Sequence, residues 1–408
     1  MIAGTQMAVA ASSFARWASD TRAAGRLPRL VVVGSVGKTT VARLVDDMAQ
    51  SCGLRTALRV DDTLEVLGRR RFSALTTWAR VLDDLAVGSL DLVVEELHWP
   101  EVASLHGSAE TIGLLIVSTI CPDREVCRLD ETRVAISSLR SLMSTLPAGV
   151  TSIVDADDVA FSLFAEMDAG KVAVAALRPQ QPAFRRFFDD GGLGAWLEEG
   201  HLMAGVDSAI DSLGPITGFP LALDGSSHFQ AHNLMAATLA AISIGLPLEV
   251  VAATLTSFTP SPAHLPRSLN LLTTATTRVI IDRPSLSCFL GPLLRTLRTL
   301  RPDRLTCVLD YPSTHPVEDL VDVGRMLARQ SQAFVLIDDE VGLAGVMGLR
   351  AGVAQTPHPP PIIHSASLPR AIRRAMAGAG EDDLTLILSP RPELVHRLLA
   401  RERMPDVA

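Results

Sequence analysis

The stretch RLVVVGSVGKTTVARLV, residues 29–45, decides the fold. Its apolar residues 30–33 predict a buried strand, and the segment that begins at Lys38 predicts a helix. Between them, Gly34 and Gly37 allow positive φ angles and a close backbone approach. A helix that begins directly after such a turn directs its first N–H groups at one point, which favours an anion. The stretch therefore predicts a phosphate-binding loop, and the alternative is a glycine turn without a ligand.

The loop GSVGKTT, residues 34–40, is a shortened variant of the GxxxxGK[ST] pattern, since Val32 stands five positions before Gly37. Lys38 would supply positive charge, and the Thr39 hydroxyl could bind Mg²⁺. Lys38 and Lys171 are the only lysines among 37 Lys and Arg residues, so a chain that otherwise uses arginine keeps a lysine in this loop. The expected contacts to a nucleotide phosphate are Gly34, Ser35, Val36, Gly37, Lys38, Thr39 and Thr40.

Short apolar runs alternate with helical segments from residue 29 to about 155, which is typical of βαβ units and a mostly parallel sheet. Ligand sites in such sheets lie at the carboxyl ends of the strands. Glu95 and Glu96 end the run DLVVEE, so both are candidate Mg²⁺ ligands, and Glu95 is a candidate catalytic carboxylate. Which of the two faces the loop stays open, because parity at a strand end is uncertain by one position. An acidic pair at a helix start is the alternative, and we assign His98 and Trp99 to packing or to the surface.

The pattern predicts an α/β fold with a P-loop central domain and a smaller, Rossmann-like C-terminal α/β domain. The expected segments are residues 1–28 as an N-terminal helical segment, 29–264 as the ATP-binding domain and 265–408 as the C-terminal domain. The boundary lies within TPSPAHLPRS, residues 259–268, which has three prolines in ten residues. Residues 181–200 predict a surface excursion, residues 220–224 a strand, and residues 232–258 two helices joined at a Gly-Leu-Pro turn.

Composition excludes several classes of function. The net charge of −8 and the absence of a long basic run argue against nucleic-acid binding. The apolar runs are far shorter than the roughly 20 residues that cross a bilayer, and the N-terminal stretch lacks a basic leader. We therefore expect a cytoplasmic protein without a membrane span. The five cysteines show no CxxC or Cys/His ligand spacing, which predicts free thiols in a reducing compartment.

The order of these motifs resembles the Mur ligase superfamily, which includes folylpolyglutamate synthase, cyanophycin synthetase and the poly-γ-glutamate synthetases. GSVGKTT resembles the family loop GTNGKTT, LVVEEL the strand that ends in a magnesium-linked glutamate, and STICPDR the family's TNIxxDH. AHNLMAATLAA is similar to HNxxNALAA, whose asparagine meets the adenine. HLPRSL falls at the family's GRxE arginine, and VIIDRPS at the aspartate that holds the ribose. By this resemblance, Asn233, Arg267 and Asp282 are expected nucleotide contacts.

The resemblance implies ATP and Mg²⁺ as cofactors and a carboxylate and an amine, small molecules or peptides, as substrates that become an amide through an acyl phosphate. The 28 residues before the first strand leave no room for a UDP-binding domain, as in the folate and poly-γ-glutamate branches. Arg124 stands where the family has a histidine that helps to hold a second Mg²⁺, and no lysine occurs between residues 39 and 170. We expect Arg124 to supply fixed positive charge as a catalytic group.

Two functions stay open at this stage. The family order of the motifs favours an ATP-dependent ligase. The missing second-metal residues favour a nucleotide-binding homologue without catalysis, which would act as a regulatory or scaffold subunit on a protein partner. A P-loop kinase would explain the loop but neither AHNLMAATLAA nor VIIDRPS.

Overall fold

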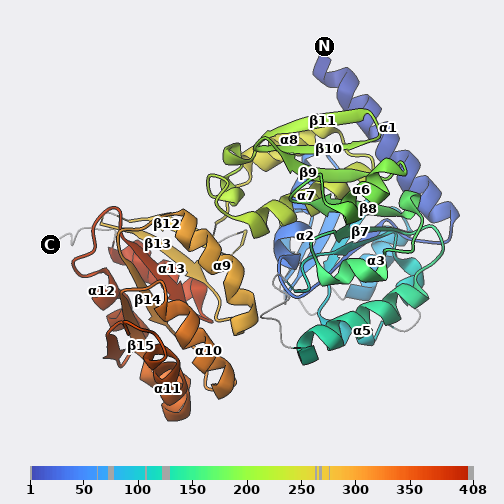
Figure 1. The fold of residues 1–408 in the computed structure, drawn as a ribbon. Helices are drawn as coiled ribbons and strands as arrows, with labels where there is room; N and C mark the ends of the chain where they lie inside the picture. Colours follow the sequence, from blue (N-terminus) through green and yellow to red (C-terminus); the bar gives the residue numbers. More distant parts are fainter. Residues whose placement is uncertain are drawn as a thin grey trace. The chain divides into compact units, whose positions relative to one another are not determined.

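The structure is a computed structural model that describes residues 2–61, 63–71, 78–105, 108–121, 129–261, 264–265, 269–274 and 276–402. The chain divides into two compact units, Met1–Phe258 and Thr259–Ala408. In Figure 1 the larger unit runs from blue to yellow and the smaller unit from orange to red. The division falls at the start of the proline-rich segment, and the N-terminal helix α1 (Ile2–Ala23) belongs to the larger unit.

A large, mostly parallel sheet forms the centre of the first unit. Its strands are β1 (Arg29–Val33), β2 (Thr56–Val60), β3 (Thr63–Val66), β4 (Arg69–Arg71), β5 (Leu92–Glu96), β6 (Leu114–Val117), β7 (Thr151–Asp155), β8 (Val172–Ala176), β9 (Gly194–Glu198), β10 (His201–Val206) and β11 (Ala209–Pro215). Their order is β11-β10-β9-β8-β7-β6-β1-β5-β2-β3-β4. The strands from β9 to β2 are parallel, and antiparallel pairs extend both edges. The carboxyl ends of β1, β2, β5, β6 and β7 therefore lie along one edge of the sheet.

Helices cover both faces of this sheet. They are α2 (Lys38–Ser51), α3 (Trp78–Ala86), α4 (Trp99–Ala103), α5 (Leu129–Thr145), α6 (Pro182–Asp189), α7 (His228–Ser243) and α8 (Leu248–Ser257). Val31 and Val33 of β1 pack with residues of α4, α5 and α6. Because successive side chains of a strand point to opposite faces, Leu30 and Val32 lie on the other face, where α2 packs against β1, β5 and α7. Both faces are buried, which explains the continuous apolar run of β1.

The smaller unit is a second α/β layer structure. Its strands are β12 (Asn270–Thr273), β13 (Arg278–Asp282), β14 (Leu305–Leu309), β15 (Ala333–Ile337), β16 (Ile362–Ser365) and β17 (Leu384–Leu388), and its helices are α9 (Ser287–Thr299), α10 (Val317–Ala328), α11 (Asp338–Ala354), α12 (Leu368–Met376) and α13 (Pro392–Glu402). The order β12-β13-β17-β14-β15-β16 is parallel except for β12. Helices α12 and α13 cover one face. Among the described residues of both units, no helix is long and apolar enough to cross a bilayer.

The predicted α/β class, with a mostly parallel first sheet and a smaller second sheet, is confirmed. Two local expectations are wrong. Residues 181–200 are not a surface excursion, because they form α6 and β9, and the buried Phe184 and Phe188 pack on Trp196. A helix of eight residues is too short to show a clear period. Residues 220–224 contain the 3₁₀ turn Pro220–Ala222 and no strand.

The expectation that all cysteines are free thiols is wrong for at least one of them. Cys121, which follows β6, is disulfide-bonded. Among the described residues, Cys52, Cys288 and Cys307 form no disulfide. The expectation failed at Cys121 because sequence spacing does not show whether two thiols meet in space.

Candidate nucleotide site

The glycine loop between β1 and α2 is held by close contacts on two sides. Gly34 and Gly37 have φ angles of 143° and 89°, which a residue with a side chain rarely adopts. A Cβ atom at Gly34 would lie 2.2 Å from Ser118 Oγ, and one at Gly37 would lie 2.2 Å from Asn233 Oδ1. The loop therefore needs glycine at both positions because the end of β6 and helix α7 fill the space around them.

The segment after β6 also holds the loop by hydrogen bonds. The N–H groups of Ser35 and Val36 donate to the Thr119 carbonyl oxygen at 2.9 and 3.1 Å. The Ser118 hydroxyl donates to the carbonyl oxygens of Val33 and Val36. One backbone oxygen thus accepts from both N–H groups, which disfavours their predicted contact with a phosphate. The N–H groups in the first turn of α2, which begins at Lys38, stay the predicted donors to a phosphate.

Lys38, Thr39 and Glu96 converge at the carboxyl edge of the sheet. The Thr39 hydroxyl donates to Glu96 Oε2 at 2.7 Å, and Lys38 Nζ lies 3.5 Å from Glu96 Oε1. The side chains of Lys38 and Glu96 are 8% and 2% exposed, so the ion pair is largely screened from water. A hydroxyl and a carboxylate are oxygen donors of the kind that Mg²⁺ binds. The residues present therefore fit the predicted Mg²⁺.

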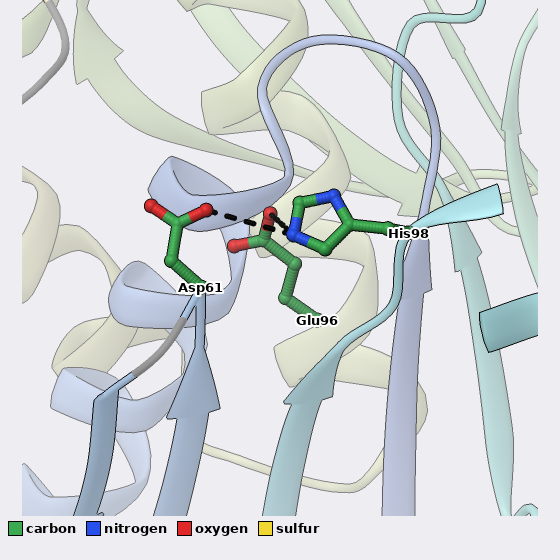
Figure 2. Close-up of side chains that lie close together, drawn as sticks. All are labelled: Asp61, Glu96 and His98. Carbon is green, nitrogen blue, oxygen red and sulfur yellow. Dashed lines mark ion pairs between the residues drawn. The ribbon is translucent and has the colours of Figure 1, made fainter. Parts of the chain in front are cut away.

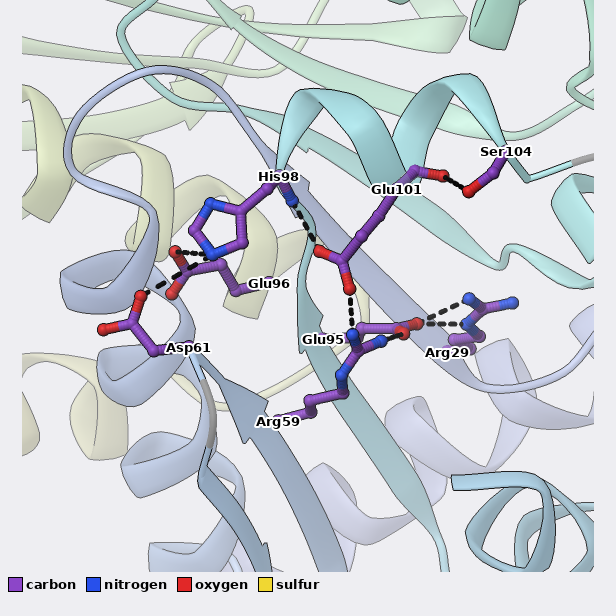
Figure 3. A network of polar contacts seen from close by, with 8 residues as sticks. All are labelled: Arg29, Arg59, Asp61, Glu95, Glu96, His98, Glu101 and Ser104. Atoms are coloured by element: carbon purple, nitrogen blue, oxygen red, sulfur yellow. Dashed lines mark hydrogen bonds and ion pairs between the residues drawn. The ribbon is translucent and has the colours of Figure 1, made fainter. Parts of the chain in front are cut away.

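Glu95 lies on the opposite face of the strand. In the register of β1 with β5 it stands beside Val31, whose side chain packs toward α4, α5 and α6. Arg29 Nε donates to Glu95 Oε2 at 2.8 Å, and Arg59 Nη1 donates to Oε1 at 2.6 Å (Figure 3). Both oxygens of Glu95 are therefore bound by arginine on the face away from Lys38, which disfavours the predicted role of Glu95 as a catalytic group and Mg²⁺ ligand. Of the two glutamates, Glu96 is the one that contacts the residues of the loop, and its role as the Mg²⁺ ligand stays a prediction.

Two further side chains gather around Glu96. Asp61 follows β2, and His98 follows β5, so both reach the same edge of the sheet (Figure 2). His98 Nε2 lies 3.6 Å from Asp61 Oδ1 and 4.0 Å from Glu96 Oε1. One ligand atom from each residue lies within 4.8 Å of the others, so the three could hold a metal ion. Asp61 was not among the predicted site residues, and His98 was assigned to packing or to the surface.

Helix α7 brings a second group of polar residues to this edge. His232 forms an ion pair with Asp155 at the end of β7, and both could hold an ion together with Asp157. Burial lowers the pKa of the His232 imidazole, but the negative charge of Asp155 raises it, and the net direction is upward. Asp158 accepts hydrogen bonds from the N–H groups of Ile120 and Cys121, and burial raises its pKa to about 6. These contacts join α7 and β7 to the segment that holds the loop.

Two of the three residues that are expected to contact the base and ribose, Asn233 and Asp282, lie among the described residues. Asn233 is buried, its Nδ2 donates to Gln230 Oε1 at 2.8 Å, and its Oδ1 lies against Gly37. Asp282 ends β13 in the smaller unit, and burial raises the pKa of its carboxyl group to about 6. Arg124 and Arg267 lie outside the described residues. The nucleotide contacts of Asn233, Arg267 and Asp282 therefore stay predictions.

No family model matches the chain. The chain is 22% identical to cyanophycin synthetase of Synechocystis sp. over 324 residues, which are 77% of this chain and 36% of that protein. It is also 22% identical to cyanophycin synthetase of Trichormus variabilis over 322 residues, 78% of this chain and 35% of that protein. The chain therefore spans about a third of the length of the curated relatives that it matches.

Solved structures identify the class of fold. A pseudomurein peptide ligase type C from Methanothermus fervidus superposes with a TM-score of 0.62 at 14% identity, over 92% of this chain and 79% of that chain. MurF from Acinetobacter baumannii gives a TM-score of 0.60 at 12% identity, over 96% and 80%. Both of the units described above thus have the Mur ligase fold. The fold that the resemblance of the motifs implied is confirmed.

Proposed function

We propose that this chain is an ATP-dependent ligase that joins a carboxylate to an amine through an acyl phosphate. The observation that carries the proposal is the convergence of Lys38 and Thr39 on the buried carboxylate of Glu96 at the carboxyl edge of a parallel sheet. The cyanophycin synthetases and peptide ligases among the similar proteins support a ligase. The chain spans only about a third of the synthetases, so we propose the class of reaction without their substrates.

Each residue of the site has a role in binding the nucleotide. Lys38 would exchange its contact with Glu96 for the β- and γ-phosphates, and the first turn of α2 would add N–H donors. Thr39 and Glu96 would hold Mg²⁺, which would neutralise charge on the phosphates. We keep Asn233 as a proposed adenine contact beside the loop.

The reaction needs positioning and neutralisation of charge more than covalent catalysis by the protein. An oxygen of the substrate carboxylate attacks the γ-phosphorus, the bond to the β,γ-bridging oxygen breaks, and ADP leaves. The amine nitrogen then attacks the acyl carbon, loses a proton and expels phosphate. The proposed substrates are a small-molecule or peptide carboxylate and an amino acid or another amine.

The two lysines of the chain provide a matched test. Isothermal titration with Mg²⁺ and a non-hydrolysable ATP analogue should show binding by the wild type and by Lys171→Ala. The Lys171 side chain is exposed, and the residue is far from the loop in the sequence. Binding should be lost in Lys38→Ala. An ADP-release screen over acids and amines then tests the ligase reaction. Absence of nucleotide binding by the wild type, or equal binding by Lys38→Ala, would overturn the site. Binding without ADP release over the whole panel would favour the non-catalytic homologue.

A further inference from the structure

The geometry points to a second cation site beside the phosphate loop, which we propose binds one divalent transition metal, with Mn²⁺ as the probe, through Asp61, Glu96 and His98. The inference rests on the proposed function in one respect only, namely that the cation would stand next to a nucleotide. The binding of the metal itself depends on the three side chains alone. Figure 2 shows them turned toward one another from the ends of β2 and β5.

The spacing of the three side chains suits a shared ion better than direct contact. The distances of 3.6 Å from His98 Nε2 to Asp61 Oδ1 and 4.0 Å to Glu96 Oε1 are too long for hydrogen bonds. Two donors bound to one ion at about 2.1 Å are separated by about 3.0–4.2 Å, depending on the angle at the metal. Both distances fall in this interval. The side chain of His98 is 49% exposed, so an ion can reach the site from solvent.

The donor set selects the kind of ion. Two carboxylates alone would suit Mg²⁺, Ca²⁺ or Mn²⁺, whereas an imidazole favours a transition metal. Mn²⁺ accepts both kinds of donor. The Thr39 hydroxyl contacts Oε2 of Glu96, whereas the His98 imidazole faces Oε1. Glu96 would therefore direct one oxygen toward the Mg²⁺ position and the other toward the second cation.

A hydrogen-bond network fixes the position of His98. The Glu101 carboxylate accepts from the backbone N–H of His98 at 2.8 Å and also pairs with Arg59 (Figure 3). Arg59 in turn donates to Glu95, which Arg29 holds from the other side. The start of α4 is therefore tied to β1, β2 and β5. His98→Ala leaves the backbone donor of this network in place, which makes it a suitable variant.

The position of Lys38 predicts that this residue of the loop weakens the binding of the metal. Its ammonium group lies 3.5 Å from Glu96 Oε1, the oxygen that also faces His98, so it competes with a cation for that oxygen. A bound nucleotide would draw Lys38 toward the phosphates and release the oxygen. Lys38→Ala should therefore bind Mn²⁺ more tightly than the wild type, although the same variant should lose the nucleotide.

The experiment is a titration of the full chain with Mn²⁺ in the absence of nucleotide, followed by EPR of the free ion. The wild type and the exposed control His358→Ala should bind Mn²⁺ at this site with equal affinity. His98→Ala should weaken binding at least about tenfold, since even the loss of a residue that supports a ligand costs about 10–100-fold. Asp61→Asn should weaken it as well, and Lys38→Ala should strengthen it.

Pulsed EPR provides a second readout. An imidazole nitrogen bound to Mn²⁺ gives nitrogen modulation, which we expect in the wild type and not in His98→Ala, and the comparison excludes the His232 imidazole as the source. Absence of saturable binding, absence of nitrogen modulation, or equal affinity of His98→Ala and the wild type would overturn the proposal. Failure of the proposed function would appear separately, as loss of nucleotide binding by a wild type that still binds Mn²⁺.

Discussion

Gly37→Ala should destabilise the larger unit by more than the same change at Gly53. Both glycines have left-handed φ angles, 89° and 78°, so alanine costs about 1–2 kcal/mol at either position through backbone strain. Their surroundings differ, because a Cβ at Gly37 would lie 2.2 Å from Asn233 Oδ1 and one at Gly53 has nothing within 4 Å. The difference between the two variants therefore isolates the contact of α7 with the loop.

The magnitude follows from how firmly Asn233 is held. It is buried, and its amide group donates to Gln230, so it has little room to move away from an added methyl group. Overpacking of this kind costs about 1–3 kcal/mol. The free energy of unfolding should fall by about 2–5 kcal/mol in Gly37→Ala and by about 1–2 kcal/mol in Gly53→Ala.

Urea unfolding followed by tryptophan fluorescence measures this difference in the larger unit alone. The four tryptophans of the chain, at positions 17, 78, 99 and 196, all belong to that unit. A double-mutant cycle of Gly37→Ala with Asn233→Ala should show a coupling of about 1–3 kcal/mol, because the second change removes the clashing oxygen. Equal destabilisation by the two glycine variants, or a cycle without coupling, would refute the reasoning.

Two further predictions concern buried charges. Glu95→Ala should destabilise the larger unit by about 3–5 kcal/mol, because it removes the main partner of the buried Arg29 guanidinium. Glu101→Ala, at the part-exposed end of the same network, should cost less than about 1 kcal/mol, and equal losses in urea unfolding would contradict this. Burial raises the pKa of Asp46 from 3.8 to about 6, so the folded state binds this proton more tightly than the unfolded state. The protonated Asp46 carboxyl group therefore contributes its full stabilisation below about pH 4, and this contribution is lost as the pH rises through 6. Above pH 6, Asp46→Asn should be more stable than the wild type by up to about 3 kcal/mol, whereas at pH 4 the two should be equally stable. The same dependence of the free energy of unfolding on pH in both proteins would disprove this.

The parts of the site that depend on local sequence could be predicted. The strand before Gly34, the glycine turn and the helix from Lys38 were predicted because apolar runs and glycine positions act over a few residues. The two faces of β5 could not be assigned, because the side of each glutamate depends on the register of β5 with β1. One feature of the sequence could have indicated the side of Glu95. Of two adjacent glutamates in a buried strand, the one that points into the protein needs a positively charged partner, and Arg29 begins the neighbouring strand.

The contacts of the site that depend on sheet order could not be predicted. Asp61 reaches Glu96 only because β2 pairs with β5 and not with β1, although β1 precedes β2 in the chain. His98 was assigned to packing or to the surface because a single histidine after a strand shows no ligand spacing in sequence. Asn233 was placed at the nucleotide by resemblance, whereas its contact with Gly37 depends on the packing of α7 against α2.

The contact between Gly37 and Asn233 also sets an order of events during synthesis. A chain that leaves the ribosome presents the glycine loop long before it contains α7, and domains fold from the N-terminus as they emerge. Until α7 has emerged and packed, the loop lacks the contact of Gly37 with Asn233. A truncated product that ends before α7 thus carries the complete loop sequence without the helix that fixes its shape. The proposed nucleotide binding should accordingly appear late in translation, after most of the larger unit has been made.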